Sequence, residues 1–214
     1  MNRAKSTVVI IGNNTRVQTL FYGRGFELIY ETKAANLRKS PDLIVFTGGE
    51  DVDPSWYHES KYYKTFPHIK RDHREMVLYE QYLNVPKVGI CRGGQFLNVM
   101  SGGSLWQHVE GHTNDHKMID LLFTKNKIRV PSTHHQMMRP SKDAFILAVA
   151  QEAKGHVSMA KTPPEKPKYD PEVVWYPKTN SLCYQSHPEY NLSGNDEQHV
   201  DYFFDLIDWA FKLP

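Results

Sequence analysis

The chain has few cysteines, little net charge and no long apolar run, and each shortage excludes a class of protein. Its 214 residues include only Cys91 and Cys183, too few for a disulfide framework. A net charge of +2 does not favour nucleic acid or an anionic membrane surface as a partner. The longest apolar runs, at 8–11 and 43–46, are far too short to cross a bilayer. We therefore expect a cytoplasmic protein whose two thiols stay reduced.

The order of strand-like and helix-like segments predicts an α/β fold. A composition of 40% hydrophobic and 23% charged residues is ordinary for a globular chain, and the length can bury a substantial core. Strand patterns alternate with helical ones in the first half, which favours a mostly parallel sheet with helices on both faces. After Gly102 the strands follow one another with few helices, which predicts an antiparallel extension. We expect a single domain over residues 1–214.

The expected elements can be given by residue range. Strands are predicted at 7–11, 26–30, 42–46, 87–90, 119–123, 127–130, 145–150, 173–176 and 182–185, and helices at 71–83, 93–100 and 197–211. The proline- and lysine-rich stretch 161–171 is predicted to be a surface loop.

Cys91 lies where a buried strand is predicted to turn into a helix. The spacing Gly89-x-Cys91-x-Gly93 matches a nucleophile elbow, a tight strained turn that exposes its middle side chain. At a helix N-terminus the free N–H groups and the dipole favour a thiolate and can receive an oxyanion. The alternative is a buried structural cysteine, because free cysteines are commonly buried.

A nucleophilic thiol needs a base, and the segment QSHPE at 185–189 contains one. His187 and Glu189 are two residues apart, so on an extended segment they point to the same side. A carboxylate beside an imidazole fixes its tautomer and supports its protonated form. Taken alone, a His-x-Glu pair is common and carries little weight.

Five ordered motifs resemble the class I glutamine amidotransferases, and most closely their γ-glutamyl hydrolase (peptidase C26) subgroup. The first three are TGGEDVDP at 47–54, GICRGGQFLNVMSGGSLWQ at 89–107 and QSHPE at 185–189. Arg71, Asp72 and Glu75 are similar to the R-D-x-x-E helix of that subgroup, and residues 132–136 are similar to its S-x-H-H-Q segment. The resemblance implies a flavodoxin-like architecture.

The resemblance also implies roles for individual residues. Cys91 matches the nucleophile, His187 the base and Glu189 the residue that orients the base. The amides of Gly49 and Arg92 match the oxyanion hole. The substrate-binding positions are Gly48, Gln95, His134 and His135. The implied reaction hydrolyses the γ-amide of glutamine or of a γ-glutamyl conjugate through a thioester, with no cofactor and no metal.

Two departures from the family pattern leave the substrate open. Ser186 stands where the family often has an aromatic residue, and the loop 161–171 replaces a region that commonly holds a short strand pair. We expect this loop and the edge near His134 and His135 to govern which γ-glutamyl compound is accepted. The protein is either a free-standing γ-glutamyl hydrolase or the glutaminase subunit of a separate synthase. A non-catalytic binding relative is a third, less favoured alternative.

Two further groups of residues are candidates for chemistry or structure. His108, His112 and His116 are four residues apart, which on a helix would suggest a metal face. Gly111 and the sequence Thr-Asn-Asp at 113–115 argue against a helix there, so these histidines are expected on loops or the surface, with no metal. Arg71 and Asp72 are expected to form an ion pair that buttresses the loop after the third strand.

Overall fold

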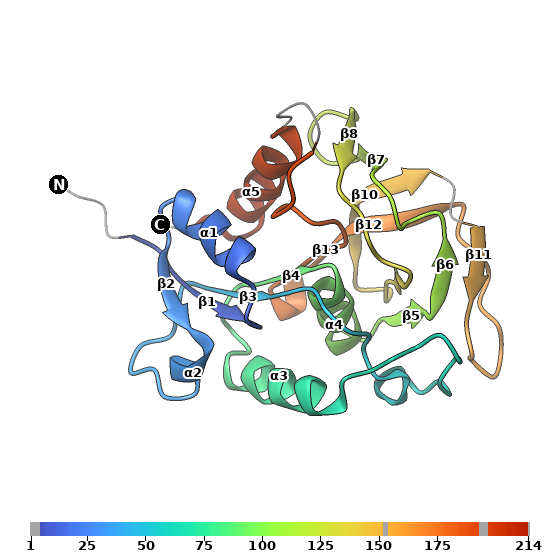
Figure 1. Ribbon diagram of the computed structural model, residues 1–214, viewed down its shortest axis with the longest axis horizontal. Coiled ribbons are helices and arrows are strands. Elements are labelled where there is room, and N and C mark those ends of the chain that lie inside the picture. The colour runs from blue at the N-terminus through green and yellow to red at the C-terminus, as the bar shows by residue number, and fades with distance from the viewer. Residues whose placement is uncertain (1–4, 152–153, 193–196, 214) are drawn as a thin grey trace.

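The centre of the molecule is a nine-stranded sheet, shown by a computed structural model that describes residues 5–151, 154–192 and 197–213 (Figure 1). The strand order is β2-β1-β3-β4-β13-β12-β10-β7-β8. The first five are parallel: β1 (Thr7–Ile11), β2 (Glu27–Tyr30), β3 (Leu43–Phe46), β4 (Lys87–Ile90) and β13 (Ser181–Tyr184). An order of this kind, with the second strand outside the first, is the flavodoxin-like arrangement that the resemblance implies.

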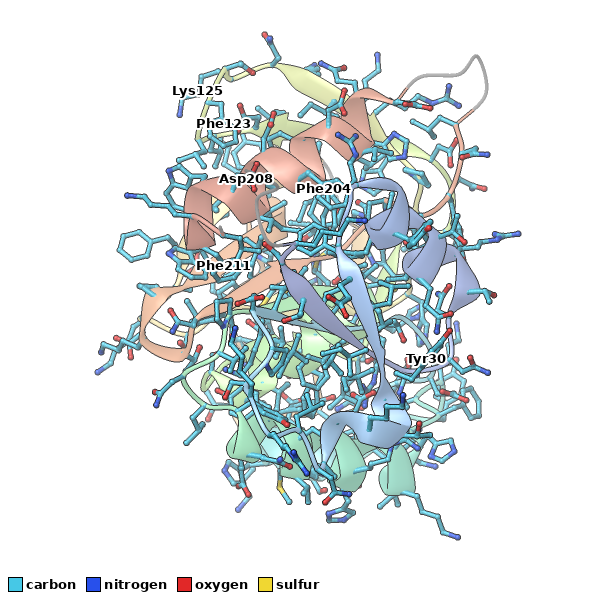
Figure 2. All side chains as sticks on the ribbon, turned by 90° about the vertical axis from the view of Figure 1, so that its left-hand side faces the viewer. Tyr30, Phe123, Lys125, Phe204, Asp208 and Phe211 are labelled. Carbon is cyan, nitrogen blue, oxygen red and sulfur yellow. The ribbon has the colours of Figure 1, made fainter. Side chains whose placement is uncertain are left out.

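Helices cover both faces of the parallel strands, which explains why those strands are apolar. Helices α1 (Thr15–Gly23) and α5 (Gln198–Phe211) lie on one face, and α2 (Glu31–Ala34), α3 (Ile69–Gln81) and α4 (Arg92–Met100) on the other (Figure 1). β3 is buried at every position, as a strand packed on both faces must be. On the first face Phe204 of α5, labelled in Figure 2, meets Phe21 of α1 edge-on. Their ring centroids are 5.3 Å apart. Each face therefore has its own apolar core.

The antiparallel part contributes the other four strands of the sheet. These are β7 (His116–Asp120), β8 (Lys127–Val130), β10 (Phe145–Gln151) and β12 (Tyr169–Tyr176). Two small two-stranded sheets join β5 (Ser104–Trp106) to β9 (Met137–Arg139) and β6 (His108–Glu110) to β11 (Lys154–Val157). Short 3-10 turns at Pro54–Tyr57 and Pro177–Thr179 complete the described elements. The antiparallel part thus extends further than the small extension expected from the sequence.

The largest differences from the predicted boundaries lie in two stretches, and elements α1, α2, β5, β6, β9 and β11 were not predicted. The stretch 161–171 is a loop only in its first part, because Tyr169, Asp170 and Pro171 belong to β12, where Pro171 pairs with Val149 of β10. The strand expected at 119–123 begins earlier and ends at Asp120, whose carboxylate accepts hydrogen bonds from the amides of the next turn. Both stretches contain charged residues or proline, which are uncommon in strands, so the local sequence does not predict the strand residues there.

Within the described ranges, no helix combines the length and the apolar character needed to cross a membrane.

Candidate active site

The carboxyl ends of three neighbouring parallel strands place the predicted motifs side by side. β3 leads into the glycine loop at 47–49, β4 into Cys91, and β13 into the segment that holds His187. Ligands of open α/β sheets bind at this edge. A cavity of about 320 Å³ opens there, lined by Asn14, Gly48, Gly49, Asp51, Cys91, Arg92, Gln95, Thr133, His134, His135, Gln136, His187 and Tyr190. Every site residue named from the sequence except Glu189 lines it.

Cys91 occupies the strained elbow that its glycine spacing predicts. Its φ of 52° and ψ of −113° lie outside the usual regions for a residue with a side chain, and it caps the N-terminus of α4. The turn is tight because a Cβ on Gly89 would lie 2.2 Å from the carbonyl oxygen of Gly93. The Cys91 amide donates to the Tyr184 carbonyl at 2.7 Å, which ties the elbow to β13. The glycines therefore permit the turn, and the turn holds the thiol in the cavity wall.

His187 and Glu189 form a buried pair, although not through the extended segment that the sequence suggests. His187 Nδ1 lies 2.9 Å from Glu189 Oε1. The segment is a turn rather than an extended strand, closed by the Tyr190 amide, which donates to the His187 carbonyl at 3.2 Å. Pro188 fixes φ inside this turn. The expected pairing is present, and the turn, not strand alternation, produces it.

The surroundings of His187 favour its protonated form. Burial opposes the imidazolium, but hydrogen bonds with Cys91 and Glu189 and their negative charges raise the pKa of His187 to about 11. Tyr190 stacks on the ring, with centroids 4.5 Å apart and planes 7° apart. The Thr133 hydroxyl lies 3.0 Å from Nε2. The ring is thus held by contacts with Glu189, Tyr190 and Thr133.

The glycine loop after β3 is held by Arg71 of α3. Its guanidinium donates to the Thr47 carbonyl at 2.8 Å and to the Gly48 carbonyl at 3.1 Å, and Nε donates to Glu75 at 2.7 Å. A Cβ on Gly49 would lie 2.0 Å from Arg71 Nη1, and the φ of 149° at Gly49 is one that residues with a side chain rarely adopt, so a substitution there would be strained. Arg71 therefore buttresses the loop as expected, but its ionic partner on the helix is Glu75 rather than Asp72.

Arg92 connects the elbow to α3. Its buried guanidinium pairs with Asp72 and Glu75, which lie one turn apart on the same face of that helix. Asp72 also accepts from the Asp53 amide at 2.9 Å. The Arg92 amide is the first of α4 and has no acceptor within the helix. Gly49 and Arg92, whose amides are predicted to form an oxyanion hole, both line the cavity, and the side chains of Arg71 and Arg92 hold the two stretches of backbone.

The remaining substrate-binding candidates differ in their exposure and in the hydrogen bonds that they already make within the protein. Gln95 Nε2 already donates to the Gln136 carbonyl at 3.0 Å. The partly exposed ring of His135 contacts Asp51 Oδ1 at 3.1 Å. His134 is buried, with Nδ1 at 2.9 Å from the same Gln136 carbonyl. His135 is thus the better placed of the two histidines to meet a substrate.

Sequence reasoning missed several of the lining residues. Asn14 caps α1, while Thr133 and Tyr190 contact His187 directly, and no local pattern marks any of these residues. Among the described residues the cavity takes none from 161–171, so its lining does not support a role for that loop in specificity. A larger depression of about 870 Å³ lies between α1 and α5 and shares Glu189 and Tyr190 with the site.

Comparisons with known proteins agree with the geometry. The family model for Peptidase C26 matches residues 28–120. A glutamine amidotransferase-like protein of Lactococcus lactis is 31% identical over 64% of this chain and 66% of its own length. A Mycobacterium tuberculosis protein that carries the name glutamine amidotransferase is 29% identical over 63% of this chain and 50% of its own. The chain spans only 30% and 50% of the first two curated relatives that it matches.

Solved structures share the whole fold. A glutamine amidotransferase from Thermotoga maritima superposes with a TM-score of 0.61 at 17% identity, covering 97% of this chain and 86% of that one. A Thermoplasma acidophilum protein described as a GMP synthase subunit superposes with a TM-score of 0.66 at 14% identity. The match covers 98% of this chain and 96% of that one. At such identities these likenesses concern the fold alone. Taken with the matched family model and the relatives, they support a place for this chain in the class I glutamine amidotransferase family.

Proposed function

We propose that the protein hydrolyses the γ-amide of glutamine or of a γ-glutamyl conjugate, with Cys91 as nucleophile, His187 as base and Glu189 as the residue that orients it. The observation that carries this proposal is the strained elbow at Cys91, facing an imidazole that is paired to a buried carboxylate. A non-glycine residue at such a φ is costly and is retained where the turn serves chemistry. A purely structural cysteine would not need it.

The proposed reaction has two halves. Cys91 Sγ attacks the γ-carbonyl carbon, and the thiol proton resides on His187. The amides of Gly49 and Arg92 receive the oxyanion. His187 then protonates the leaving nitrogen as the C–N bond breaks, which leaves a thioester. Water, deprotonated by His187, attacks the thioester, the C–S bond breaks, and glutamate leaves as the thiol is restored.

The leaving group distinguishes two forms of this function. In one, the amine of a γ-glutamyl conjugate is released to solvent by a free-standing hydrolase, as the peptidase C26 match favours. In the other, ammonia passes to a separate synthase, which is favoured by the likeness to PurLQS of Thermotoga maritima and to the protein assigned to GMP synthase. The second form predicts low glutaminase activity for the isolated chain.

The test is glutamate release from glutamine and from a panel of γ-glutamyl amines, with the parent chain, Cys91→Ala and Cys183→Ala. Cys183 is a matched control because it is fully buried in β13 and burial raises the pKa of its thiol. We expect Cys91→Ala to lose turnover and Cys183→Ala to keep it. A glutamine-analogue electrophile should label Cys91 only. Undiminished turnover in Cys91→Ala would overturn the proposal.

A further inference from the structure

Three histidines from separate segments converge on the buried carboxylate of Glu172. His112 lies in the loop before β7, His116 begins β7, His134 follows β8, and Glu172 belongs to β12. Glu172 Oε1 lies 3.0 Å from His116 Nε2, 3.5 Å from His112 Nδ1 and 3.9 Å from His134 Nε2. None of these contacts has a role in the proposed hydrolysis. We call these four residues the Glu172 cluster.

In each imidazole the ring nitrogen that points away from Glu172, here called the outer nitrogen, lies beside a hydrogen-bond acceptor. His112 Nε2 lies 2.8 Å from Asp170 Oδ2, His134 Nδ1 lies 2.9 Å from the Gln136 carbonyl, and His116 Nδ1 lies 3.4 Å from the Asn114 carbonyl. These acceptors place the proton of a neutral ring on the outer nitrogen. The inner nitrogen then presents a lone pair toward Glu172. Carboxylates and carbonyls orient metal-bound histidines in this way.

Two of the inner nitrogens are buried without a hydrogen-bond partner. They are His112 Nδ1 and His134 Nε2. A buried lone pair that faces a carboxylate is unfavourable unless a cation lies between them. Either extra protons or a metal ion must supply that positive charge.

The spacing of the inner atoms suits a metal ion. In a tetrahedral zinc site with bonds of about 2.0–2.1 Å, the ligand atoms lie about 3.3 Å from one another. The ligand atoms of His112, His116 and Glu172 all lie within 4.8 Å of one another, so a small inward movement brings them to bonding distance. The side chain of His116 is 16% exposed, whereas those of His112 and Glu172 are 3% and 0% exposed, so an ion can enter past His116.

We propose that the Glu172 cluster binds a divalent transition metal, with Zn²⁺ the best fit, through His112 Nδ1, His116 Nε2 and Glu172 Oε1. Two imidazoles and one carboxylate with an open fourth position are a common zinc ligand set. His134 stacks on His112, with centroids 4.8 Å apart, and its Nε2 lies farthest from Glu172. That lone pair accepts a hydrogen bond from a metal-bound water in the fourth position.

This site revises what the spacing of the histidines suggests. The sequence correctly argues against a helix through 108–116, and His112 does lie on a loop, although its ring is buried, whereas His108 and His116 belong to strands β6 and β7. His108 contacts His135 instead and is not part of the cluster. A strand register, not a helix face, brings His116 to Glu172. The proposal is independent of the hydrolytic function.

The test is zinc binding by the full chain in the Cys91→Ala background, because the active-site thiol would itself bind Zn²⁺. Metal-free protein is titrated with Zn²⁺ by calorimetry, and the retained metal is counted by mass spectrometry after gel filtration. We expect one equivalent. Adding His116→Asn or Glu172→Gln should abolish it, and Asp170→Asn should weaken it by about 10–100-fold, as does the loss of other groups that orient a metal-bound histidine. The matched control His73→Asn, an exposed histidine on α3, should bind as the parent does.

If a variant fails to fold, a measurement on the chain with an intact Glu172 cluster still tests the metal site. Co²⁺ replaces Zn²⁺ in the unsubstituted cluster, and its paramagnetic shifts report which imidazole resonances lie beside the ion. Large shifts of His112, His116 and His134 support the site. Failure of the folded Cys91→Ala chain to retain Zn²⁺, equal binding by His116→Asn, or shifts confined to other histidines would overturn it and leave protonated imidazoles as the source of charge.

Discussion

Arg71 offers a direct test of whether the glycine loop after β3 is part of the catalytic machinery. We consider Arg71→Met, which keeps most of the length of the side chain but removes its donors. The variant loses hydrogen bonds of 2.8 Å and 3.1 Å to the Thr47 and Gly48 carbonyls, together with the 2.7 Å contact to Glu75. Breaking a buried ion pair costs about 3–5 kcal/mol. Because Glu75 keeps Arg92 as a partner, we expect the lower end, about 3 kcal/mol.

The effect on turnover follows from the same contacts. Without Arg71 the Gly48–Gly49 backbone loses the contacts that hold it, and the Gly49 amide, the proposed oxyanion donor, is no longer kept in one orientation. Loss of one such donor costs about 10²–10³ in kcat. The nucleophile should be unaffected, because Cys91 is held by the β4–α4 elbow. We therefore expect kcat to fall by about two orders of magnitude while alkylation of Cys91 by iodoacetamide continues at the parent rate.

Urea unfolding followed by tryptophan fluorescence, and glutamate release at saturating substrate, measure the two effects separately. The matched control is Arg74→Met on the same helix. Arg74 is 55% exposed and pairs with Glu31 at 2.8 Å, a surface ion pair worth about 0–1 kcal/mol. Equal loss of stability in the two variants would refute the account of the buried network. A normal kcat in a destabilised Arg71→Met protein would show that the loop does not supply an oxyanion donor.

Three further predictions concern His187. Glu189→Gln should lower kcat less than His187→Ala does, because the amide keeps the hydrogen bond to Nδ1 but not the charge; equal loss would give Glu189 a direct chemical role. Thr133→Val should lower kcat by roughly 2–10-fold with KM unchanged, the value of one hydrogen bond to the ring; a change in KM alone would place Thr133 on the substrate instead. The raised pKa of His187, about 11 in the folded chain against about 6.5 unfolded, contributes stability that is complete below pH 6.5 and disappears as pH rises through 11. The difference in unfolding free energy between the parent and His187→Asn should therefore shrink with rising pH, and urea titrations that show it constant or growing would contradict the ionic pairing.

The sequence is most informative where structure is local. The elbow at Cys91 depends on glycines two residues away on either side, and the apolar strands at 7–11, 43–46 and 87–90 mark a parallel core because both of their faces are buried. The partner of Arg92 could not be predicted. Asp72 and Glu75 lie on one helical face, but that this face meets the elbow depends on how α3 packs. Helix α1 was missed because Val17 and Phe21 are its only buried residues.

The Glu172 cluster shows why long-range placement escaped prediction. Its members span 112–172 and meet only because β7, β10 and β12 pair in antiparallel register. In sequence His112 and His116 are four residues apart, a spacing typical of one face of a helix, but His112 lies on a loop and His116 on a strand. The acidic partners lie next to a proline-rich loop, where a strand was not expected. The contacts between these acidic residues and the histidines form only when the sheet folds, so no local sequence pattern predicts them.

Ser186 connects the segment that carries His187 to the Glu172 cluster. It is also one of the two places where the chain departs from the family pattern. Its hydroxyl donates to Glu172 Oε2 at 3.0 Å, while Oε1 of the same carboxylate faces the histidines. An aromatic side chain such as phenylalanine, which the family often has at this position, cannot make that bond. The next residue is His187, whose amide donates to the Pro131 carbonyl near the start of the segment that carries Thr133 and His134. Glu172 is therefore hydrogen-bonded to the residue that directly precedes His187, the proposed base. A change of charge or a bound metal at Glu172 would reach His187 through this bond, which exists because the chain has serine at position 186.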